Sequence, residues 1–78
     1  MTDADAKKRR QNILDFYRRN CAIPFWKASL NHDGKSMDKI CTMGDYFKRG
    51  VYMSFPHSRF YDAFNRIDDE VRKEMGIE

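Results

Sequence analysis

Cysteine, histidine and proline are scarce in this chain, with two residues of each, and glycine occurs four times. Apolar residues are interrupted so often that no run approaches the roughly 18 residues of a membrane-spanning helix. The largely charged residues 2–10 are not followed by the apolar core of a secretory signal. We therefore expect no membrane association and a cytoplasmic location.

The two cysteines, Cys21 and Cys41, lie 20 residues apart and form no closely spaced pair. Lone cysteines of this kind are usually reduced and structural in cytosolic proteins, whereas small secreted domains carry disulfide frameworks. Together with His32 and His57 they would be spaced by 11, 9 and 16 residues, which lacks the short paired spacing of zinc sites. We expect two reduced thiols, with a single disulfide as the alternative, and neither a metal nor another cofactor.

Catalytic motifs are also absent from the sequence. His32 and His57 are the only histidines, and neither stands in a recognisable arrangement with a serine, cysteine or aspartate that would make a nucleophile. His32 falls in the turn-forming sequence of residues 31–35, and His57 follows Pro56, so both are expected in solvent. We expect no catalytic residues and interpret the chain as a binding protein rather than an enzyme.

Composition and length favour one small globular domain covering residues 1–78. Hydrophobic residues make up 41% and charged residues 35%, and the 14% of aromatic residues exceeds what a disordered chain contains. The net charge of +3 is unevenly distributed: residues 1–50 contain 11 basic and 6 acidic side chains, and residues 51–78 contain 4 basic and 6 acidic ones. The first half is therefore the expected contact for a polyanion.

The spacing of apolar residues predicts a mainly α protein, a compact bundle of about three helices near residues 3–20, 37–49 and 56–75. At the start of the first helix, Thr2 and Asp5 have the spacing of a capping box, in which each residue satisfies a free backbone N–H of the other. The acidic side chains of this turn also suit the positive end of the helix dipole.

Helix boundaries in the middle of the chain are predicted from a few residues that interrupt, begin or end helices. Pro24 interrupts the pattern, so residues 21–30 are expected either as a short helix or as an irregular segment. Ser36 can cap the second helix, and Gly50 is a stop signal at its end. The β-branched and aromatic residues among 51–55 then favour a short extended segment.

The last helix carries the clearest apolar stripe in the sequence. Its members recur at helical spacing, and Gly76 follows them as a C-terminal cap: Phe60, Phe64, Ile67, Val71 and Met75. This stripe is expected to pack in the core against apolar residues of the other two helices: Ile13, Tyr17, Ile40 and Phe47. Acidic and basic residues four positions apart should pair along its outer face, among them Asp68 and Arg72.

Two large aromatic residues stand side by side four times, each pair next to a basic residue: Phe16-Tyr17, Phe25-Trp26, Tyr46-Phe47 and Phe60-Tyr61. Consecutive side chains on a helix point about 100° apart, so one member of each pair can be buried while its neighbour reaches the surface. Exposed aromatic surface beside cations suits nucleic acid, where bases stack and phosphates pair with cations. It also suits a protein interface, where aromatic residues and arginine dominate.

Our first functional hypothesis is a non-catalytic, regulatory or accessory protein that binds nucleic acid, DNA rather than RNA. The second and third helices resemble a loose helix-turn-helix, whose second helix would lie in the major groove. Its readers of base edges would be Arg59, Asn65 and Arg66. Phosphates would be held by the basic residues of the first helix: Lys7, Lys8, Arg9, Arg10, Arg18 and Arg19. The acidic residues 68–70 would repel DNA if the whole last helix lay along the groove.

The alternative hypothesis is a protein–protein interaction module, such as a small inhibitor or an accessory subunit that docks on a larger protein complex. Its anchors would be Trp26, Tyr46 and Tyr61, surrounded by basic side chains. The two hypotheses differ in their response to salt, because phosphate contacts release counterions and weaken steeply as salt rises. The sequence specifies neither the partner nor the oligomeric state.

Overall fold

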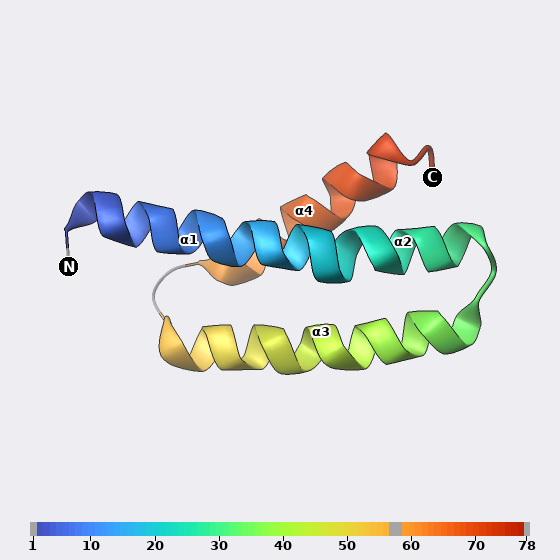
Figure 1. The fold of residues 1–78 in the computed structure, drawn as a ribbon, viewed down its shortest axis with the longest axis horizontal. Coiled ribbons are helices and arrows are strands. Elements are labelled where there is room, and N and C mark those ends of the chain that lie inside the picture. The colour runs from blue at the N-terminus through green and yellow to red at the C-terminus, as the bar shows by residue number, and fades with distance from the viewer. Residues whose placement is uncertain (1, 57–58, 78) are drawn as a thin grey trace.

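The computed structural model describes residues 2–56 and 59–77, and it confirms a mainly α bundle of three helical rods, with no strand in these residues. The first rod consists of α1 (Asp3–Tyr17), a π-helical segment η1 (Arg18–Ala22) and α2 (Ile23–Leu30). The second rod, α3 (Gly34–Ser54), runs back antiparallel to the first, and α4 (Phe60–Glu74) crosses behind α1 and η1 (Figure 1). None of these helices has the length and apolarity needed to cross a bilayer.

The first rod continues through Pro24, so the prediction that the first helix ends near Asn20 is wrong. A proline inside a helix clashes with the carbonyl four residues earlier, here that of Asn20. In η1, directly before Pro24, the Ile23 N–H donates to the carbonyl of Arg18, five residues back. This wider turn accommodates the proline ring without ending the helix, and residues 23–30 are helical rather than irregular.

The second rod begins earlier and ends later than predicted. Its cap is Asp33 rather than Ser36: one Asp33 carboxylate oxygen accepts from the Ser36 N–H at 3.2 Å, and the other accepts from the Ser36 hydroxyl at 2.6 Å. Gly50 does not stop the helix, and the predicted extended segment at 51–55 is wrong for residues 51–54, which are helical. Val51 is buried in the core, and this packing outweighs its β propensity.

The third rod starts at Phe60 rather than at residue 56, after Arg59 in the left-handed region (φ 53°). The preceding residues 57 and 58, which include His57, lie outside the described residues. Gly76, with φ 73°, takes the left-handed conformation expected of a C-terminal cap.

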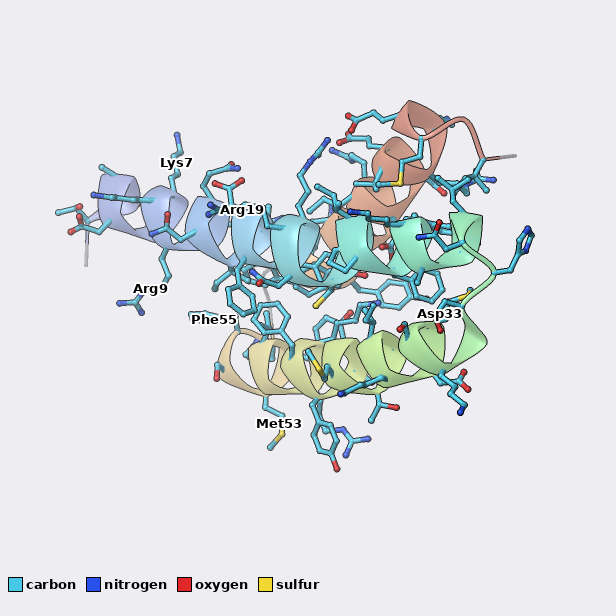
Figure 2. All side chains as sticks on the ribbon, turned by 45° about the vertical axis from the view of Figure 1, so that its right-hand side comes forward. Lys7, Arg9, Arg19, Asp33, Met53 and Phe55 are labelled. Atoms are coloured by element: carbon cyan, nitrogen blue, oxygen red, sulfur yellow. The ribbon has the colours of Figure 1, made fainter. Side chains whose placement is uncertain are left out.

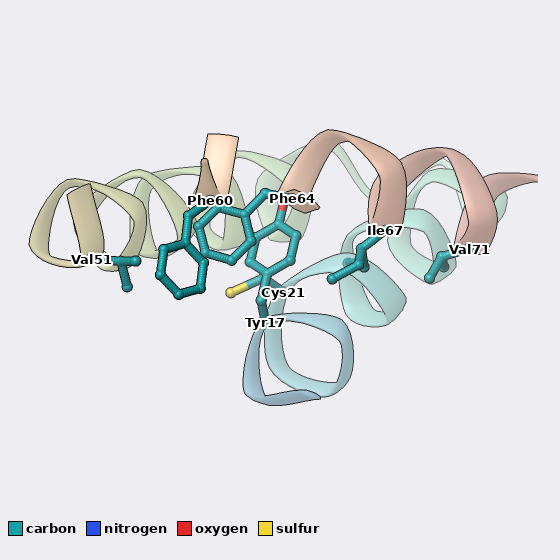
Figure 3. Close-up of a cluster of buried hydrophobic side chains, with 8 residues drawn as sticks. Tyr17, Cys21, Val51, Phe60, Phe64, Ile67 and Val71 are labelled. Atoms are coloured by element: carbon teal, nitrogen blue, oxygen red, sulfur yellow. The ribbon is translucent and has the colours of Figure 1, made fainter. Parts of the chain in front are cut away.

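The core forms where the three rods meet, as Figure 3 shows. The predicted stripe of α4 is confirmed, since four of its members are buried: Phe60, Phe64, Ile67 and Val71. They pack on buried residues of the first two rods, namely Tyr17, Cys21, Ala22 and Val51, with Ile13 and Phe47 partly buried against them. Ile40 is half-buried outside this cluster.

Candidate nucleic-acid interface

The start of α1 extends beyond the ends of α3 and α4, along the longest axis of the molecule (Figure 1). Thr2 is its cap, and the Thr2 hydroxyl accepts from the Asp5 N–H at 3.2 Å, which confirms the predicted N-terminal cap. Residues 2–9 are all exposed, and Arg10 is half-buried. We call residues 7–10 the basic turn. It holds four of the candidate phosphate ligands: Lys7, Lys8, Arg9 and Arg10.

The four cations of the basic turn point in different directions around the helix axis. Because successive helical residues are rotated by about 100°, four in a row cover the full circumference of the helix. Figure 2 shows Lys7 and Arg9 extending from opposite sides of α1. Such a turn cannot place all four charges against one flat surface. It suits a ligand that presents negative charge on two sides of a helix.

The basic turn borders a cleft of about 280 Å³ between α1 and the start of α4. Four apolar residues and three cations line it: Ala6, Ile13, Phe55, Phe60, Lys7, Arg9 and Arg10. The Arg10 guanidinium lies over the Phe60 ring, 4.6 Å from its centroid, in a cation–π contact. This contact places the basic turn next to the beginning of α4, which connects the two parts of the chain expected to act together.

Arg18 was predicted to hold a phosphate, but in the structure it pairs with carboxylates of α4. Its guanidinium forms ion pairs with Glu74 at 2.7 Å and with Glu70 at 3.2 Å, both on α4. The hydrogen bonds to Glu74 and Glu70 raise the pKa of Arg18 further above its ordinary value. Arg18 therefore joins the first rod to α4 and is a poor candidate for a phosphate ligand. Arg19, its neighbour, is exposed.

The predicted base readers lie on a face of mixed charge. Arg59, Asn65 and Arg66 are exposed, as a reading role requires. The exposed carboxylates of Asp62 and Asp69 lie on the same outer side of α4, opposite its buried stripe. Negative side chains beside the readers oppose the approach of a phosphate backbone along α4, so the helix-turn-helix interpretation is weaker than the sequence suggested.

The alternative protein anchors differ in accessibility. Tyr46 and Tyr61 are 72% and 64% exposed, whereas Trp26 is half-buried beside Phe25, with ring centroids 5.0 Å apart in an edge-to-face arrangement. The Trp26 indole nitrogen is buried and has no hydrogen-bond partner among the described residues. Tyr46 and Tyr61 are therefore available as anchors on the surface, and Trp26 belongs to the edge of the core.

A half-buried polar contact between the first rod and α4 was not predicted from the sequence. The Tyr17 hydroxyl donates to the Asp68 carboxylate, and burial, together with this contact, raises the pKa of Tyr17 well above its ordinary value. The Lys48 ammonium lies 5.2 Å from the centroid of the Tyr17 ring. Asp68 follows Phe64 by four residues and so lies on nearly the same face of α4, which made its inward position predictable from the apolar stripe. The expectation that Asp68 pairs with Arg72 is wrong, because Arg72 pairs instead with Asp69 at 3.6 Å.

Both thiols are free, but they occupy different surroundings. Cys21 is buried, and desolvation raises the pKa of its thiol. Cys41 is exposed, so the expectation that both cysteines are structural holds only for Cys21. The two residues border one cleft of about 110 Å³, together with Tyr17, Trp26 and other residues of α2, α3 and α4.

The described residues hold no group of three or more His, Cys, Asp or Glu side chains placed to bind a metal ion. The site is defined by the exposed cations of α1, the aromatic contact of Arg10 with Phe60, and the mixed surface of α4. Comparisons with protein families, curated proteins and solved structures found no match to this chain.

Proposed function

We propose that the protein binds nucleic acid through the basic turn of α1, as a non-catalytic regulatory or accessory protein. One observation carries this proposal: four consecutive cations are arranged around α1 close to its N-terminal end, and that end extends beyond the rest of the bundle. The major groove of B-DNA is about 12 Å wide and admits an α-helix between its two phosphate backbones. Cations on opposite sides of α1, such as Lys7 and Arg9, would then pair with phosphates of both strands.

The proposed contacts are to phosphates rather than to base edges. Lysine and arginine on a helix position a protein on the duplex without reading its sequence. The candidate readers Asn65 and Arg66 stand beside the carboxylates of Asp62 and Asp69, which disfavours deep insertion of α4. We therefore propose binding that tolerates many DNA sequences, with Arg59 at the start of α4 as a further phosphate contact. The free thiols favour the cytoplasm, where cysteines stay reduced.

A salt series with a fluorescent DNA duplex of random sequence tests the proposal. Replacing Lys8 and Arg9 by alanine removes two exposed charges from the basic turn. If each contacts a phosphate, the slope of log affinity against log salt should fall by about 0.9 per lost contact. The matched control replaces Lys27 and Lys73, which are exposed on α2 and α4, and removes the same charge elsewhere.

The wild type and the control variant should share one salt slope, and the Lys8/Arg9 variant should have a shallower one. If the salt slope fell equally in the Lys8/Arg9 variant and in the control variant, net charge alone would attract DNA. Lack of binding by the wild type at low salt would disprove the proposed function. Substitution of Asn65 should leave the preference among duplexes unchanged if α4 reads no bases.

A further inference from the structure

The outer face of α3 carries apolar side chains that the bundle leaves uncovered. Met43, Tyr46 and Met53 are 52%, 72% and 78% exposed. Gly44 and Val51, on the opposite side of α3, are buried against the first rod and the core. Figure 2 shows Met53 extending away from α1 and α2. Large apolar residues grouped in this way on a small protein commonly mark an interaction surface.

The same face is cationic. We define the α3 outer face as the positions within roughly 60° of Tyr46 around the helix: Lys35, Lys39, Thr42, Met43, Tyr46, Arg49, Gly50 and Met53. It contains three cations and no carboxylate. The acidic residues Asp38 and Asp45 lie roughly 80–100° away. None of the three cations forms an ion pair within the part of the chain that the structure describes.

A groove continues this face towards α4. Its volume is about 500 Å³, and six residues line it: Asp45, Lys48, Arg49, Tyr52, Met53 and Tyr61. The rings of Tyr52 and Tyr61 lie 6.4 Å apart, so aromatic surface extends from α3 to α4. Arg49 and Met53 belong to both the outer face and the groove, which makes the two a single surface.

We propose that this surface docks an acidic, amphipathic helix of a partner protein. Methionine side chains adapt to the apolar ridge of a helix, and tyrosine and arginine are the residues that most often anchor interfaces. Lys39 and Arg49 are ten residues apart, or roughly 15 Å along α3. A partner helix of about three turns would therefore place its apolar residues on Met43, Tyr46 and Met53, with carboxylates beside the two cations.

Charge spacing favours a protein partner over nucleic acid at this surface. In the basic turn four cations are consecutive, whereas on α3 the cations are separated by Met43 and Tyr46. Methionine offers nothing to a phosphate backbone but adds apolar contact area to a protein interface. The α3 outer face is separate from the basic turn, and this inference does not depend on the proposed DNA binding.

Two synthetic peptides of about 18 residues test the inference, since this length forms five turns of helix. Both carry leucine on one face, and the opposite face carries glutamate in one peptide and lysine in the other. Binding of a fluorescent peptide is measured by anisotropy, and the contacted residues are mapped by amide chemical shifts. The glutamate peptide should bind and shift resonances of α3, and the lysine peptide should not bind.

Variants of exposed residues separate apolar from charged contributions. Replacing Tyr46 and Met53 by alanine should weaken binding of the glutamate peptide roughly tenfold or more, as expected for interface anchors. Arg49→Glu should weaken binding of the glutamate peptide and strengthen binding of the lysine peptide. Lys73→Glu, an equal charge reversal on α4, should not change the binding of either peptide. Thermal melting should show that all three variants fold.

Several results would overturn the inference. It fails if the glutamate peptide does not bind, if both peptides bind alike, or if the shifted resonances lie on the basic turn. It also fails if the Tyr46/Met53 variant loses affinity for duplex DNA or for anionic lipid vesicles while it keeps its affinity for the glutamate peptide. Loss of DNA binding in the Lys8/Arg9 variant alone would leave this surface intact, so the two proposals fail separately.

Discussion

The Tyr17 hydroxyl donates to both oxygens of the Asp68 carboxylate, at 2.9 and 2.8 Å, and so links α1 to α4 through two residues that are 51 positions apart in the sequence. Burial raises the pKa of Asp68, and the hydrogen bond from Tyr17 and the charge of Lys48 lower it, leaving it above its ordinary value. A half-buried carboxylate with a hydroxyl donor is tolerated in the core. Without that donor it would be a costly group.

Tyr17→Phe should therefore destabilise the protein by roughly 1–3 kcal/mol at neutral pH, the cost of leaving a half-buried carboxylate without its donor. Urea unfolding monitored by circular dichroism measures this difference. Tyr61→Phe is the matched control, because the Tyr61 ring is exposed and removal of its hydroxyl should change stability little. An equal effect of the two substitutions would contradict the structural role of the Tyr17–Asp68 contact.

The destabilisation by Tyr17→Phe should depend on pH. Because the pKa of Asp68 is raised on folding, its contribution to stability is present below its unfolded pKa and is lost as pH rises through its folded pKa. Removing Tyr17 removes a cause that lowers this pKa, so the folded pKa of Asp68 rises further in the variant. The free-energy difference from the wild type should be small in acid and grow towards neutral pH. A difference that is the same from acid to neutral pH would show that Asp68 is not involved.

Phe64 should be among the most sensitive positions in the core. Its side chain is fully buried, and its ring centroid lies 4.5 Å from that of Tyr17 and 5.7 Å from that of Phe60. Phe64→Ala should cost roughly 3–5 kcal/mol of unfolding free energy, through lost burial and the cavity left behind. Tyr61→Ala, at an exposed position of the same helix, should cost much less in the same urea titration. Similar costs would mean that the buried face of α4 is misassigned.

How much could be predicted from the sequence depends on the range of the interactions. The buried stripe of α4 was predictable because the period of Phe60, Phe64 and Ile67 is a property of one helix. The ion pairs of Arg18 were not, since Glu70 and Glu74 lie 52 and 56 residues away. Local sequence preferences also gave wrong predictions at Pro24 and Val51. A π-helical turn lets the helix continue through Pro24, and burial in the core keeps Val51 helical. The basic turn was predictable as a charge run, but its position near the projecting end of α1 and the contact of Arg10 with Phe60 were not.

The two cysteines should react with alkylating reagents at different rates. Cys41 is exposed, whereas Cys21 is buried and the pKa of its thiol is raised, so little thiolate is accessible there. Intact-mass analysis of the native protein should show one label added quickly, and two labels after unfolding without reductant. Two labels at equal rates in the native protein would contradict the burial of Cys21. No label after unfolding would reveal a disulfide in place of two thiols.

Arg18→Ala should separate structural cations from those proposed to bind phosphate. Its ion pairs with Glu70 and Glu74 are partly exposed, so their loss should cost only roughly 0.5–1 kcal/mol of unfolding free energy. That cost should shrink as salt screens the charges, which urea titrations at low and high salt measure. The salt slope of DNA binding should stay unchanged in Arg18→Ala, because its guanidinium already holds two carboxylates. A slope that falls by about 0.9, the loss expected for one phosphate contact, would place Arg18 among the phosphate ligands and would require the α4 ion pairs to open on binding.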